Sequence, residues 1–358
     1  MTNRLNTSQS IDSDVEHVRD SGVADSAGLS RRGVLGLGAG LAAWAMLGGR
    51  VRAEPAAPAI ATTLALRKIR VARLAHLTDT HIQPELGANE GVQACLKHVA
   101  TASPDLIVTG GDLIMDGFAA DFDRTKLQFD LFTRAFKDHA PCKVEHCLGN
   151  HDIWGWNKSK SKTKGNESQW GKKWAVETLG LPREYHAFDV DVGRGAGGGA
   201  SGWRVIVLDS VRPDGKGYIA HLDDPQQDWL KSELAKSARQ HVLVVSHIPI
   251  IAACTLRGSW DGKATRRTLS GGLMHLDGGT LHKTFAAAGN VKLCLSGHIH
   301  QIDRVEMEGV TYICDGAVSG SWWKGANGST REGYGVIDLF SDGSFEHAYV
   351  PFGWTART

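Results

Sequence analysis

Residues 71–81 read VARLAHLTDTH, an apolar run that ends directly in Asp79 and His81. Four more segments repeat this form, in which an apolar run typical of a buried strand leads into residues that can bind a metal. They read DLIVTGGD (105–112), VEHCLGNHD (144–152), HVLVVSH (241–247) and VKLCLSGHIH (291–300). Because functional groups gather at the carboxyl ends of strands in sheets flanked by helices, the five segments predict one convergent site.

The candidate ligands in these segments are carboxylate, amide and imidazole groups, without a thiolate. Such oxygen and nitrogen ligands suit zinc, manganese, iron or cobalt. They suffice for two ions about 3.5–4 Å apart, which can clamp the attacking and leaving oxygens of an in-line phosphoryl displacement. Asp112 is the natural bridge between two ions, because Gly111 allows a tight turn beside them. Asn150 offers a neutral oxygen, whereas His151 would point elsewhere and could donate a proton.

The five blocks D-x-H, G-D, G-N-H-D, H and G-H-x-H together resemble the signature of the calcineurin-like metallophosphoesterase superfamily, over roughly residues 69–350. The resemblance implies an α/β fold, a two-sheet α-β-β-α sandwich. It also implies a cofactor of two divalent or trivalent metal ions, drawn from iron, manganese, zinc and cobalt. The implied reaction is metal-dependent phosphoester hydrolysis, with a metal-bridging hydroxide that attacks phosphorus in line.

The resemblance also assigns a role to each site residue. The implied metal ligands are Asp79, His81 and His300 for a first ion, Asn150, His247 and His298 for a second, and Asp112 as the bridge. His151 would protonate the leaving group or stabilise the transition state. Asp152 would orient His151, as a carboxylate commonly does for an imidazole.

Two positions bear on the branch of the superfamily. The first block is D-x-H instead of the D-x-G of purple acid phosphatases, and Met115 stands where those enzymes carry a tyrosine. The chain therefore looks more like the phosphodiesterases and nucleotidases, including the cyclic-nucleotide phosphodiesterase type. We favour a phosphodiesterase acting on a small-molecule phosphoester. A phosphomonoesterase or nucleotidase is the alternative, and an inactive binding protein of this fold is disfavoured because the ligand set is complete.

The N-terminal 53 residues predict an export signal. Arg31 and Arg32 precede an apolar stretch rich in Gly and Ala (33–49), and Ala53 is a small residue at a potential cleavage point. This pattern is typical of a Tat signal peptide, with the Tat translocase as a partner during export and the periplasm or secretion as destination. A stable membrane anchor is disfavoured because the apolar stretch falls short of about 20 residues. Residues 54–68 predict a linker, and residues 69–358 the metallophosphoesterase domain.

The charge of the remaining chain is balanced. Without residues 1–53 it has 34 basic and 34 acidic residues. Such a balance gives no electrostatic footprint for nucleic acid or for an anionic membrane, and neither is expected as a partner. Among the six cysteines, Cys147, Cys294 and Cys314 lie in strand-like runs, which favours buried thiols. Cys142 and Cys147 are one potential disulfide pair, but both lie on one strand run, which disfavours the geometry.

Strand and helix patterns alternate along the domain, as in α/β proteins. The predicted elements are strands at 70–77, 105–109 and 143–148, helices at 89–101 and 122–138, and a hairpin connection at 193–202. A helix over 225–238 should begin with Asp224 as N-cap and Pro225 at its first position. Only strand patterns follow His300, which predicts a second sheet packed on the first.

Two tryptophans directly follow a ligand block, and two more follow a strand-like run near the predicted site. Trp154 and Trp156 could stack on a nucleobase or pack their own loop, and the sequence does not separate these alternatives. Trp322 and Trp323 raise the same question, and packing is favoured. The Lys-rich segment 158–173 predicts a solvated loop, although it could attract an anionic substrate. Asp209, which ends a strand-like run, is interpreted as structural.

Overall fold

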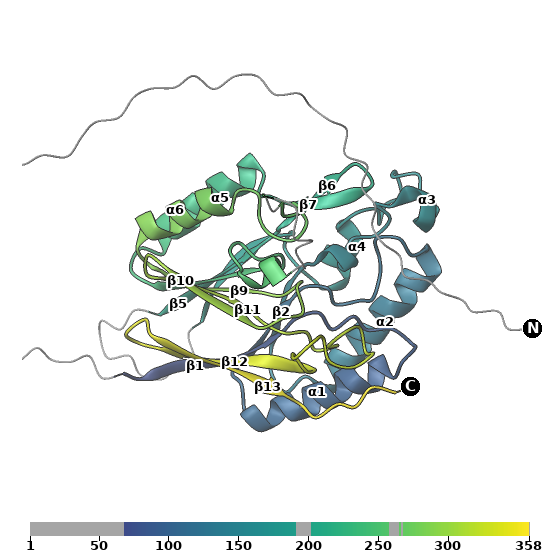
Figure 1. Cartoon of the computed structure of the whole chain (residues 1–358), viewed down its shortest axis with the longest axis horizontal. Helices are drawn as coiled ribbons and strands as arrows, with labels where there is room; N and C mark the ends of the chain where they lie inside the picture. Colours follow the sequence, from purple (N-terminus) through teal and green to yellow (C-terminus); the bar gives the residue numbers. More distant parts are fainter. Residues whose placement is uncertain (1–67, 191–201, 258–264, 266–267, 358) are drawn as a thin grey trace, which may run out of the picture. The chain divides into compact units, whose positions relative to one another are not determined.

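The strands that precede the ligand blocks lie in two sheets, and the sheets are packed between two layers of helices (Figure 1). The structure, a computed structural model, describes residues 68–190, 202–257, 265 and 268–357. The layer order confirms the predicted α-β-β-α sandwich. The predicted signal peptide, nearly all of the linker and most of the connection at 193–202 lie outside the described residues.

The strands and helices follow the predicted alternation closely. The strands are β1 (Arg70–Leu77), β2 (Leu106–Gly110), β3 (Val144–Cys147), β4 (His186–Val190), β5 (Trp203–Leu208), β6 (Val211–Asp214), β7 (Gly217–Ala220), β8 (His241–Ser246), β9 (Val291–Ser296), β10 (Asp303–Met307), β11 (Val310–Cys314), β12 (Gly333–Phe340) and β13 (Phe345–Pro351). The α-helices are α1 (Ala88–Ala102), α2 (Phe122–His139), α3 (Lys158–Ser161), α4 (Lys173–Thr178), α5 (Asp224–Lys236) and α6 (Gly278–Ala288). Two 3₁₀ turns are η1 (Asn150–Asp152) and η2 (Cys254–Arg257).

Each sheet contributes parallel strands whose ends meet at the site. The five-stranded sheet has the order β13-β12-β1-β2-β3, with β1, β2 and β3 parallel. The six-stranded sheet has the order β10-β11-β9-β8-β5-β4, with β5, β8, β9 and β11 parallel. Three ligand blocks therefore leave one sheet, and the blocks with His247 and His298 leave the other. A small hairpin, β6–β7, stands apart from both sheets.

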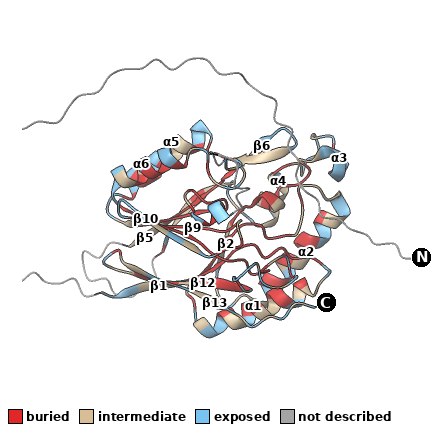
Figure 2. Cartoon of the chain, in the orientation of Figure 1, coloured by how far each residue is buried: buried red, intermediate tan, exposed pale blue. Residues whose placement is uncertain are grey.

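Three apolar layers hold the elements in this order. Leu74 of β1 and Val205 of β5 lie in the central layer between the two sheets. The neighbouring Ala75 points to the layer beneath α1 and α2, and Ile206 points to the layer beneath α5 and α6. Successive side chains of a strand face opposite sides, so one strand serves two layers. Figure 2 shows the buried residues along the facing surfaces of sheets and helices.

The C-terminal strands are distributed differently from the prediction. They do not form a second sheet of their own, because β10 and β11 extend the six-stranded sheet whereas β12 and β13 extend the five-stranded one. β12 pairs antiparallel with β1, beside the strand that carries the first ligand block. Pairing between strands that lie far apart in sequence leaves no local pattern, so the sequence predicted the strands but not their partners.

Three smaller predictions concern the N-cap of α5, the cysteines and membrane-spanning helices. The N-cap of α5 is Asp223, whose side chain accepts a hydrogen bond from the Gln226 amide, so the prediction of Asp224 was wrong by one residue. All six cysteines are free. Cys147, Cys294 and Cys314 are buried, as their strand-like runs predicted, and of the other three only Cys142 is partly exposed. Among the described residues, no helix is both long and apolar enough to span a membrane.

Candidate dinuclear metal centre

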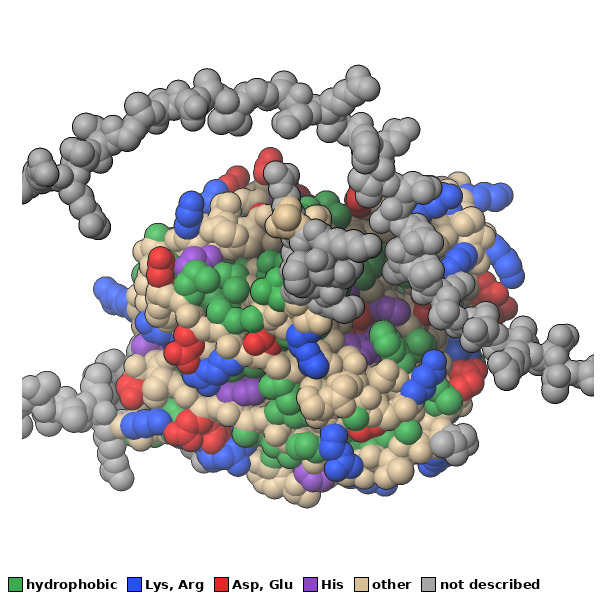
Figure 3. Space-filling model, viewed as in Figure 1, with side chains coloured by type: hydrophobic (Ala, Val, Ile, Leu, Met, Phe, Trp, Pro, Cys, Tyr) green, Lys and Arg blue, Asp and Glu red, His purple; other side chains and the backbone are tan. Residues whose placement is uncertain are grey.

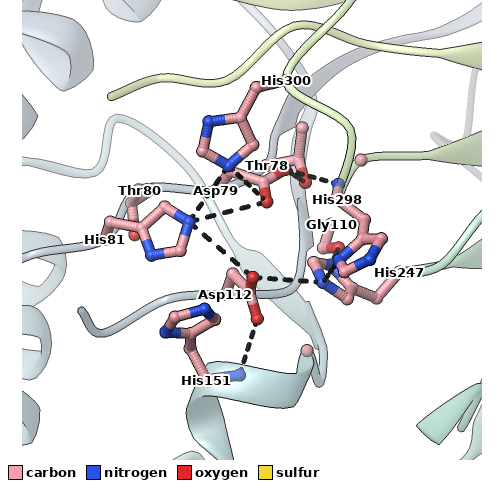
Figure 4. Close-up of polar contacts among 12 residues, drawn as sticks. Thr78, Asp79, Thr80, His81, Gly110, Asp112, His151, His247, His298 and His300 are labelled. Atoms are coloured by element: carbon pink, nitrogen blue, oxygen red, sulfur yellow. Dashed lines mark hydrogen bonds and ion pairs between the residues drawn. The ribbon is translucent and has the colours of Figure 1, made fainter. Parts of the chain in front are cut away.

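The side chains of the five ligand blocks point toward one another at the ends of the two sheets (Figure 4). Potential ligand atoms form three sets, and within each set the atoms lie within 4.8 Å of one another. The sets are Asp79, His81 and His300; His81, Asp112 and His151; and Asp112, His247 and His298. The first and third of these contain all the predicted ligands of the two ions except Asn150, and we call them the first set and the second set. Figure 3 shows histidine side chains in a recess of the molecular surface.

In the first set, two imidazoles and a carboxylate face a common point. Nε2 of His81 lies 3.1 Å from Nε2 of His300, which lies 3.2 Å from Oδ1 of Asp79. The other carboxylate oxygen, Oδ2, accepts hydrogen bonds from the Thr78 hydroxyl at 2.5 Å and the His298 amide at 2.9 Å. Oδ1 is buried and accepts no hydrogen bond. One oxygen of Asp79 is thus held by the protein, and the other is left to the site.

In the second set, His247 is the central residue. Its Nε2 lies 3.2 Å from Nδ1 of His298 and 3.2 Å from Oδ1 of Asn150. The same nitrogen lies 3.2 Å from Oδ2 of Asp112. Asn150 opens the 3₁₀ turn η1 and is 4% exposed, so this turn brings its amide into the cluster predicted for the second ion.

Asp112 stands between the two sets. Its Oδ2 lies 3.2 Å from Nε2 of His247 and 3.7 Å from Nε2 of His81. Its Oδ1 accepts a hydrogen bond of 2.8 Å from the His151 amide. As with Asp79, one carboxylate oxygen is fixed by the protein and the other faces the ligand nitrogens. This placement fits the bridging role that the sequence predicted.

Left-handed backbone conformations occur throughout the cluster. Five of the predicted ligands have φ between 39° and 70°, namely Asp79, His81, Asp112, His298 and His300. Each such conformation costs a non-glycine residue about 1–3 kcal/mol and persists only where surrounding contacts impose it. Backbone hydrogen bonds from Asp79 to Gly111 and from His81 to Asp112 supply part of that constraint, because they extend the β1–β2 pairing beyond the sheet.

Two glycines allow the ligand segments to approach closely. A Cβ atom on Gly149 would lie 2.2 Å from both the amide nitrogen and Oδ1 of Asp112. A Cβ atom on Gly297 would lie 1.8 Å from the Thr78 hydroxyl oxygen and 2.3 Å from Oδ2 of Asp79. The glycines of the G-N-H-D block and of the G-H-x-H block are therefore required by contact between blocks.

A model of the calcineurin-like phosphoesterase family matches residues 72–302 of this chain. The chain belongs to that family. It is therefore a metal-dependent hydrolase of phosphoric esters, with the mixed α/β fold of its structural relatives.

Two phosphodiesterases and one solved structure are similar to this phosphoesterase at low sequence identity. It is 25% identical over 235 residues to a probable cyclic nucleotide phosphodiesterase from Synechococcus sp., covering 64% of this chain and 73% of that protein. It is 28% identical over 242 residues to the 3',5'-cyclic adenosine monophosphate phosphodiesterase CpdA of Escherichia coli K12, covering 64% and 70%. A dimetal phosphatase from Danio rerio aligns with a TM-score of 0.51 and 14% identity, over 76% and 94%, and shares the fold.

Backbone carbonyls orient four imidazoles of the phosphoesterase site. The pairs are His247 Nδ1 with Gly110 at 2.8 Å, His298 Nε2 with Gly272 at 2.9 Å, His300 Nδ1 with Gly320 at 2.6 Å, and His151 Nδ1 with Met115. A ring nitrogen that donates to a carbonyl leaves the opposite nitrogen free as a ligand or acceptor. Sequence reasoning missed these carbonyls, because a backbone oxygen carries no residue-type signal.

The predicted role of Asp152 is wrong. Its carboxylate is buried and accepts hydrogen bonds from the amides of Leu113 at 2.8 Å, Ile114 at 3.2 Å and Gly149 at 2.8 Å. The His151 ring instead contacts the Met115 carbonyl. Within η1 the two neighbouring side chains point in different directions. Asp152 therefore ties the segment after Asp112 to the third ligand block and does not orient His151.

In each of two buried carboxylate–imidazole pairs, the carboxylate favours protonation of the imidazole. Burial opposes ionisation of every member, yet Asp112 raises the pKa of His247 to about 9, and Asp79 raises the pKa of His300. In turn, the neighbouring imidazoles hold the pKa values of Asp79 and Asp112 well below their usual range. In the metal-free protein a protonated His247 therefore balances Asp112 near pH 7, and the contact between Asp79 and His300 favours the same separation of charge.

The remaining imidazoles of the two sets are neutral near pH 7. Burial lowers the pKa of His81 to about 4 and the pKa of His298 to about 3. A neutral imidazole has a free lone pair, which a metal ligand requires. Burial, together with the charge of Asp112, raises the pKa of Asp152 to about 7.

The two neighbouring tryptophans Trp322 and Trp323 differ sharply. Trp323 is fully buried, and packing is confirmed for it. Trp322 is 39% exposed and its ring centroid lies 4.9 Å from that of His300, so this ring packs against the site on one side and faces solvent on the other. Across the site, the Tyr218 ring lies edge-on to His298 at 6.1 Å. Aromatic side chains thus contact ligand rings of both sets.

The tryptophans after the G-N-H-D block pack within the protein. Trp154 is 4% exposed and lies edge-on to Trp174 at 5.2 Å. Trp156 is half-buried against Phe118, and Nζ of Lys172 lies 5.4 Å from its ring centroid. Of the two alternatives left open by the sequence, the structure shows packing contacts for both rings.

Asp209 holds a buried ion-pair network beside the site. Nζ of Lys172 lies 2.5 Å from Oδ2 of Asp209, which also lies 2.5 Å from Nη1 of Arg212. This confirms a structural role for Asp209, but Lys172 is not part of a solvated loop. The network joins the segment before α4 to the hairpin β6–β7, which carries Tyr218.

Proposed function

We propose that this chain is a phosphodiesterase whose centre holds two metal ions. The observation that carries the proposal is the position of Asp112, whose Oδ2 faces His81 of the first set and His247 of the second. A carboxylate between two ligand sets suits two adjacent ions, which clamp the attacking and leaving oxygens of a phosphoryl displacement when bound. The ligands would be those implied by the sequence: Asp79, His81 and His300; Asn150, His247 and His298; and Asp112 as the bridge.

The donor set fits divalent metals. Oδ1 of Asp79 is buried and accepts no hydrogen bond, although two imidazole nitrogens converge beside it. Without a metal, the closest counter-charge to this oxygen is the His300 imidazole at 3.2 Å, and a bound cation would replace the missing hydrogen bond. Both sets combine carboxylate with imidazole and contain no thiolate, which suits zinc, manganese, iron or cobalt.

His151 is the best-placed proton donor for the leaving group. Its Nδ1 faces the Met115 carbonyl, so Nδ1 carries a proton and Nε2 is the nitrogen available to the substrate. Its ring lies edge-on to His81 with centroids 4.8 Å apart, at the first set. Proton donation requires the imidazolium form of His151, which carries a proton on each ring nitrogen. An ester oxygen that departs on this side would take the Nε2 proton as the bond to phosphorus breaks, and Nδ1 would keep its proton against the Met115 carbonyl.

A diester is favoured as substrate over a monoester. The support is the similarity to two cyclic nucleotide phosphodiesterases, at 25% and 28% identity. Phosphomonoester or nucleotide hydrolysis is the alternative, since the same centre can displace either leaving group. Within the diesters, cyclic nucleotides are the class to examine first.

The test compares matched substrates on protein reconstituted with zinc, manganese, iron or cobalt. We expect bis-p-nitrophenyl phosphate to be hydrolysed faster than p-nitrophenyl phosphate, and 3',5'-cyclic adenosine monophosphate faster than adenosine 5'-monophosphate. An Asp112→Asn preparation purified in parallel controls for contaminating phosphatases. Faster cleavage of both monoesters would support the alternative, and no cleavage with any metal would contradict the proposal.

We further propose that the protein is exported by the Tat pathway. The support is the sequence alone, because Arg31, Arg32 and the apolar stretch at 33–49 lie outside the described residues. Replacing both arginines by lysine should retain the protein in the cytoplasm of a bacterial host. Cell fractionation measures this, and undiminished periplasmic protein in the double variant would contradict the proposal.

A further inference from the structure

Residues 317–325, which we call the clamp segment, bind the backbone of the first ligand block. The amides of Val318 and Ser319 donate to the carbonyls of Thr78 and Asp79, at 2.9 and 3.2 Å. The carbonyl of Gly320 contacts Nδ1 of His300 at 2.6 Å. The clamp segment therefore fixes one edge of the centre, and whatever side chain it presents there has a defined position.

Trp323 anchors the clamp segment in the core. Its indole N–H donates to the carbonyls of Thr80 at 3.0 Å and His81 at 3.1 Å. The ring is fully buried against α1, where a Cβ atom on Gly91 would lie 2.1 Å from it. The contact with Gly91 and the two hydrogen bonds leave this indole one orientation.

Trp322 is directed away from that anchor, toward the site. Both residues have left-handed backbone conformations, with φ of 50° for Trp322 and 68° for Trp323. The Trp322 ring lies 4.9 Å from His300 at an interplanar angle of 42°, and 6.1 Å from His81. It is also among the exposed large apolar side chains, at 39%. A strained, exposed indole that touches two candidate ligand rings requires a functional explanation.

His151 and Trp322 both lie beside the His81 ring. The rings of His151 and Trp322 both contact His81, at 4.8 and 6.1 Å. A leaving group that takes a proton from His151 and extends past the His81 ring would meet the exposed indole. Aromatic faces bind planar rings by stacking, whatever the hydrogen-bonding pattern of the ring.

We propose that Trp322 is a stacking platform for a planar aromatic leaving group, such as an aryl or nucleoside moiety, and so determines substrate specificity. The proposal rests on the proposed phosphoesterase centre and names the substrate class that this centre prefers. Stacking of this kind is worth about tenfold in affinity. The competing explanation is that Trp322 only supports His300, in which case its loss would affect all substrates and metal retention alike.

A binding experiment separates the two explanations without catalysis. Phenylphosphonate and methylphosphonate are inert anions that differ in the planar ring, and calorimetry on metal-reconstituted protein gives both affinities. We expect phenylphosphonate to bind about tenfold more tightly than methylphosphonate to the native protein. Trp322→Ala should abolish that preference while leaving methylphosphonate affinity and metal content unchanged. Trp322→Phe, which keeps an aromatic face, should retain most of the preference.

Other outcomes would overturn the proposal in distinguishable ways. A preference that survives in Trp322→Ala, or an equal loss for both phosphonates together with lost metal, would show that Trp322 is not a platform. Absence of binding by either phosphonate to the native protein would instead contradict the phosphoesterase centre itself. Trp229→Ala is the matched control, because Trp229 lies on α5, outside the site, and packs against Tyr185.

Kinetics provide the second measurement. Methyl phosphodiesters of phenol and of hexafluoroisopropanol have leaving groups of similar acidity but different shape. Trp322→Ala should lower kcat/KM about tenfold for the phenyl ester and leave the fluoroalkyl ester unchanged. An equal decrease for both esters would overturn the proposed platform.

Discussion

Oδ2 of Asp112 lies 3.2 Å from Nε2 of His247, although the two residues follow strands of different sheets. Asp112 follows β2 in the five-stranded sheet, and His247 follows β8 in the six-stranded sheet. Their contact forms only when the sheets pack through the central apolar layer. The site is therefore a product of tertiary structure, and metal binding should depend on the folded sandwich.

Asp112→Asn should remove both metal ions and abolish activity. The amide retains the shape of the carboxylate but loses the charge that is shared by the two ligand sets. We expect metal content, measured by mass spectrometry of the purified protein, to fall from about two ions per chain to below one. Asp116→Asn is the matched control, because this carboxylate accepts a hydrogen bond from the Ala119 amide away from the ligand atoms. Two tightly bound ions in Asp112→Asn would contradict the bridging assignment.

His151→Ala should keep both metals and lose about 10²–10⁴-fold in turnover, the usual contribution of a general acid. The loss should be greatest for esters with poor leaving groups, since a nitrophenolate needs little protonation. Rates across a series of leaving groups, together with metal content, measure this. An equal loss for every leaving group would indicate charge stabilisation without proton transfer, and loss of metal would make His151 a ligand.

Asp152 should behave differently from its neighbour. Because its carboxylate holds the amides of Leu113, Ile114 and Gly149, Asp152→Ala leaves three buried donors unpaired. Each such donor costs about 1–3 kcal/mol. We expect a clear decrease in the free energy of unfolding and weaker metal binding, with the leaving-group dependence of the residual activity unchanged. A changed dependence with native stability would restore the role predicted from the sequence.

The sequence predicted those parts of the site that residue type and the order of the strands determine. Ligand blocks that follow buried strands must converge at the ends of the sheets, so the cluster of Asp79, Asp112 and His247 could be predicted. The orientation of each imidazole could not, because backbone carbonyls such as that of Gly320 determine it. Asp152 shows the same limit, since adjacency to His151 in sequence says nothing about direction within a 3₁₀ turn.

The fold shows a related limit. Strand patterns after His300 were correct, but local patterning does not reveal that β12 pairs with β1. Trp322 and Trp323 have the same residue type in adjacent positions and both have left-handed backbones, and the space above Gly91, which the Trp323 ring fills, decides which ring is buried. Tertiary contacts of this kind separate residues that the sequence treats alike.

Gly297→Ala should disrupt the centre through contact alone. Its added Cβ would overlap the Thr78 hydroxyl at 1.8 Å and force the first and last ligand blocks apart. Overpacking of this kind costs about 1–3 kcal/mol, and we expect metal affinity to decrease with it. Gly279→Ala is the control, because nothing lies within 4 Å of its added Cβ on the exposed side of α6. Unaltered metal affinity in Gly297→Ala would show that the blocks tolerate separation.

Asp209→Asn should destabilise the protein more than Lys172→Met. Removing the carboxylate leaves the two largely buried cations Lys172 and Arg212 without a shared partner, whereas removing Lys172 leaves the Asp209–Arg212 pair intact. Breaking a buried pair costs about 3–5 kcal/mol, and we expect Asp209→Asn to approach that range. Urea unfolding of both variants measures the order, and Lys231→Met, which removes an exposed pair, is the control. The reverse order would show that Lys172, and not Asp209, organises the network.

Metal uptake should release protons and strengthen with increasing pH. In the metal-free protein the pKa of His247 is raised to about 9 because the charge of Asp112 outweighs burial. A metal needs the neutral imidazole, so binding near pH 7 should displace at least the proton of His247. Potentiometric titration of zinc into weakly buffered apoprotein measures the release, and affinity should rise until pH reaches about 9.

The stability of the apoprotein should change with pH in the opposite direction and decrease as the pH rises. Because the folded pKa lies above the ordinary value of 6.5, protonated His247 stabilises the apoprotein fully below that value, and this contribution is lost as pH rises through about 9. The melting temperature of the apoprotein should therefore fall across this interval, while that of the metal-loaded protein should not. His247→Gln, which cannot be protonated, should remove both the proton release and the pH-dependent part of the melting temperature. Release of an equal number of protons by His247→Gln would assign them to another group of the centre.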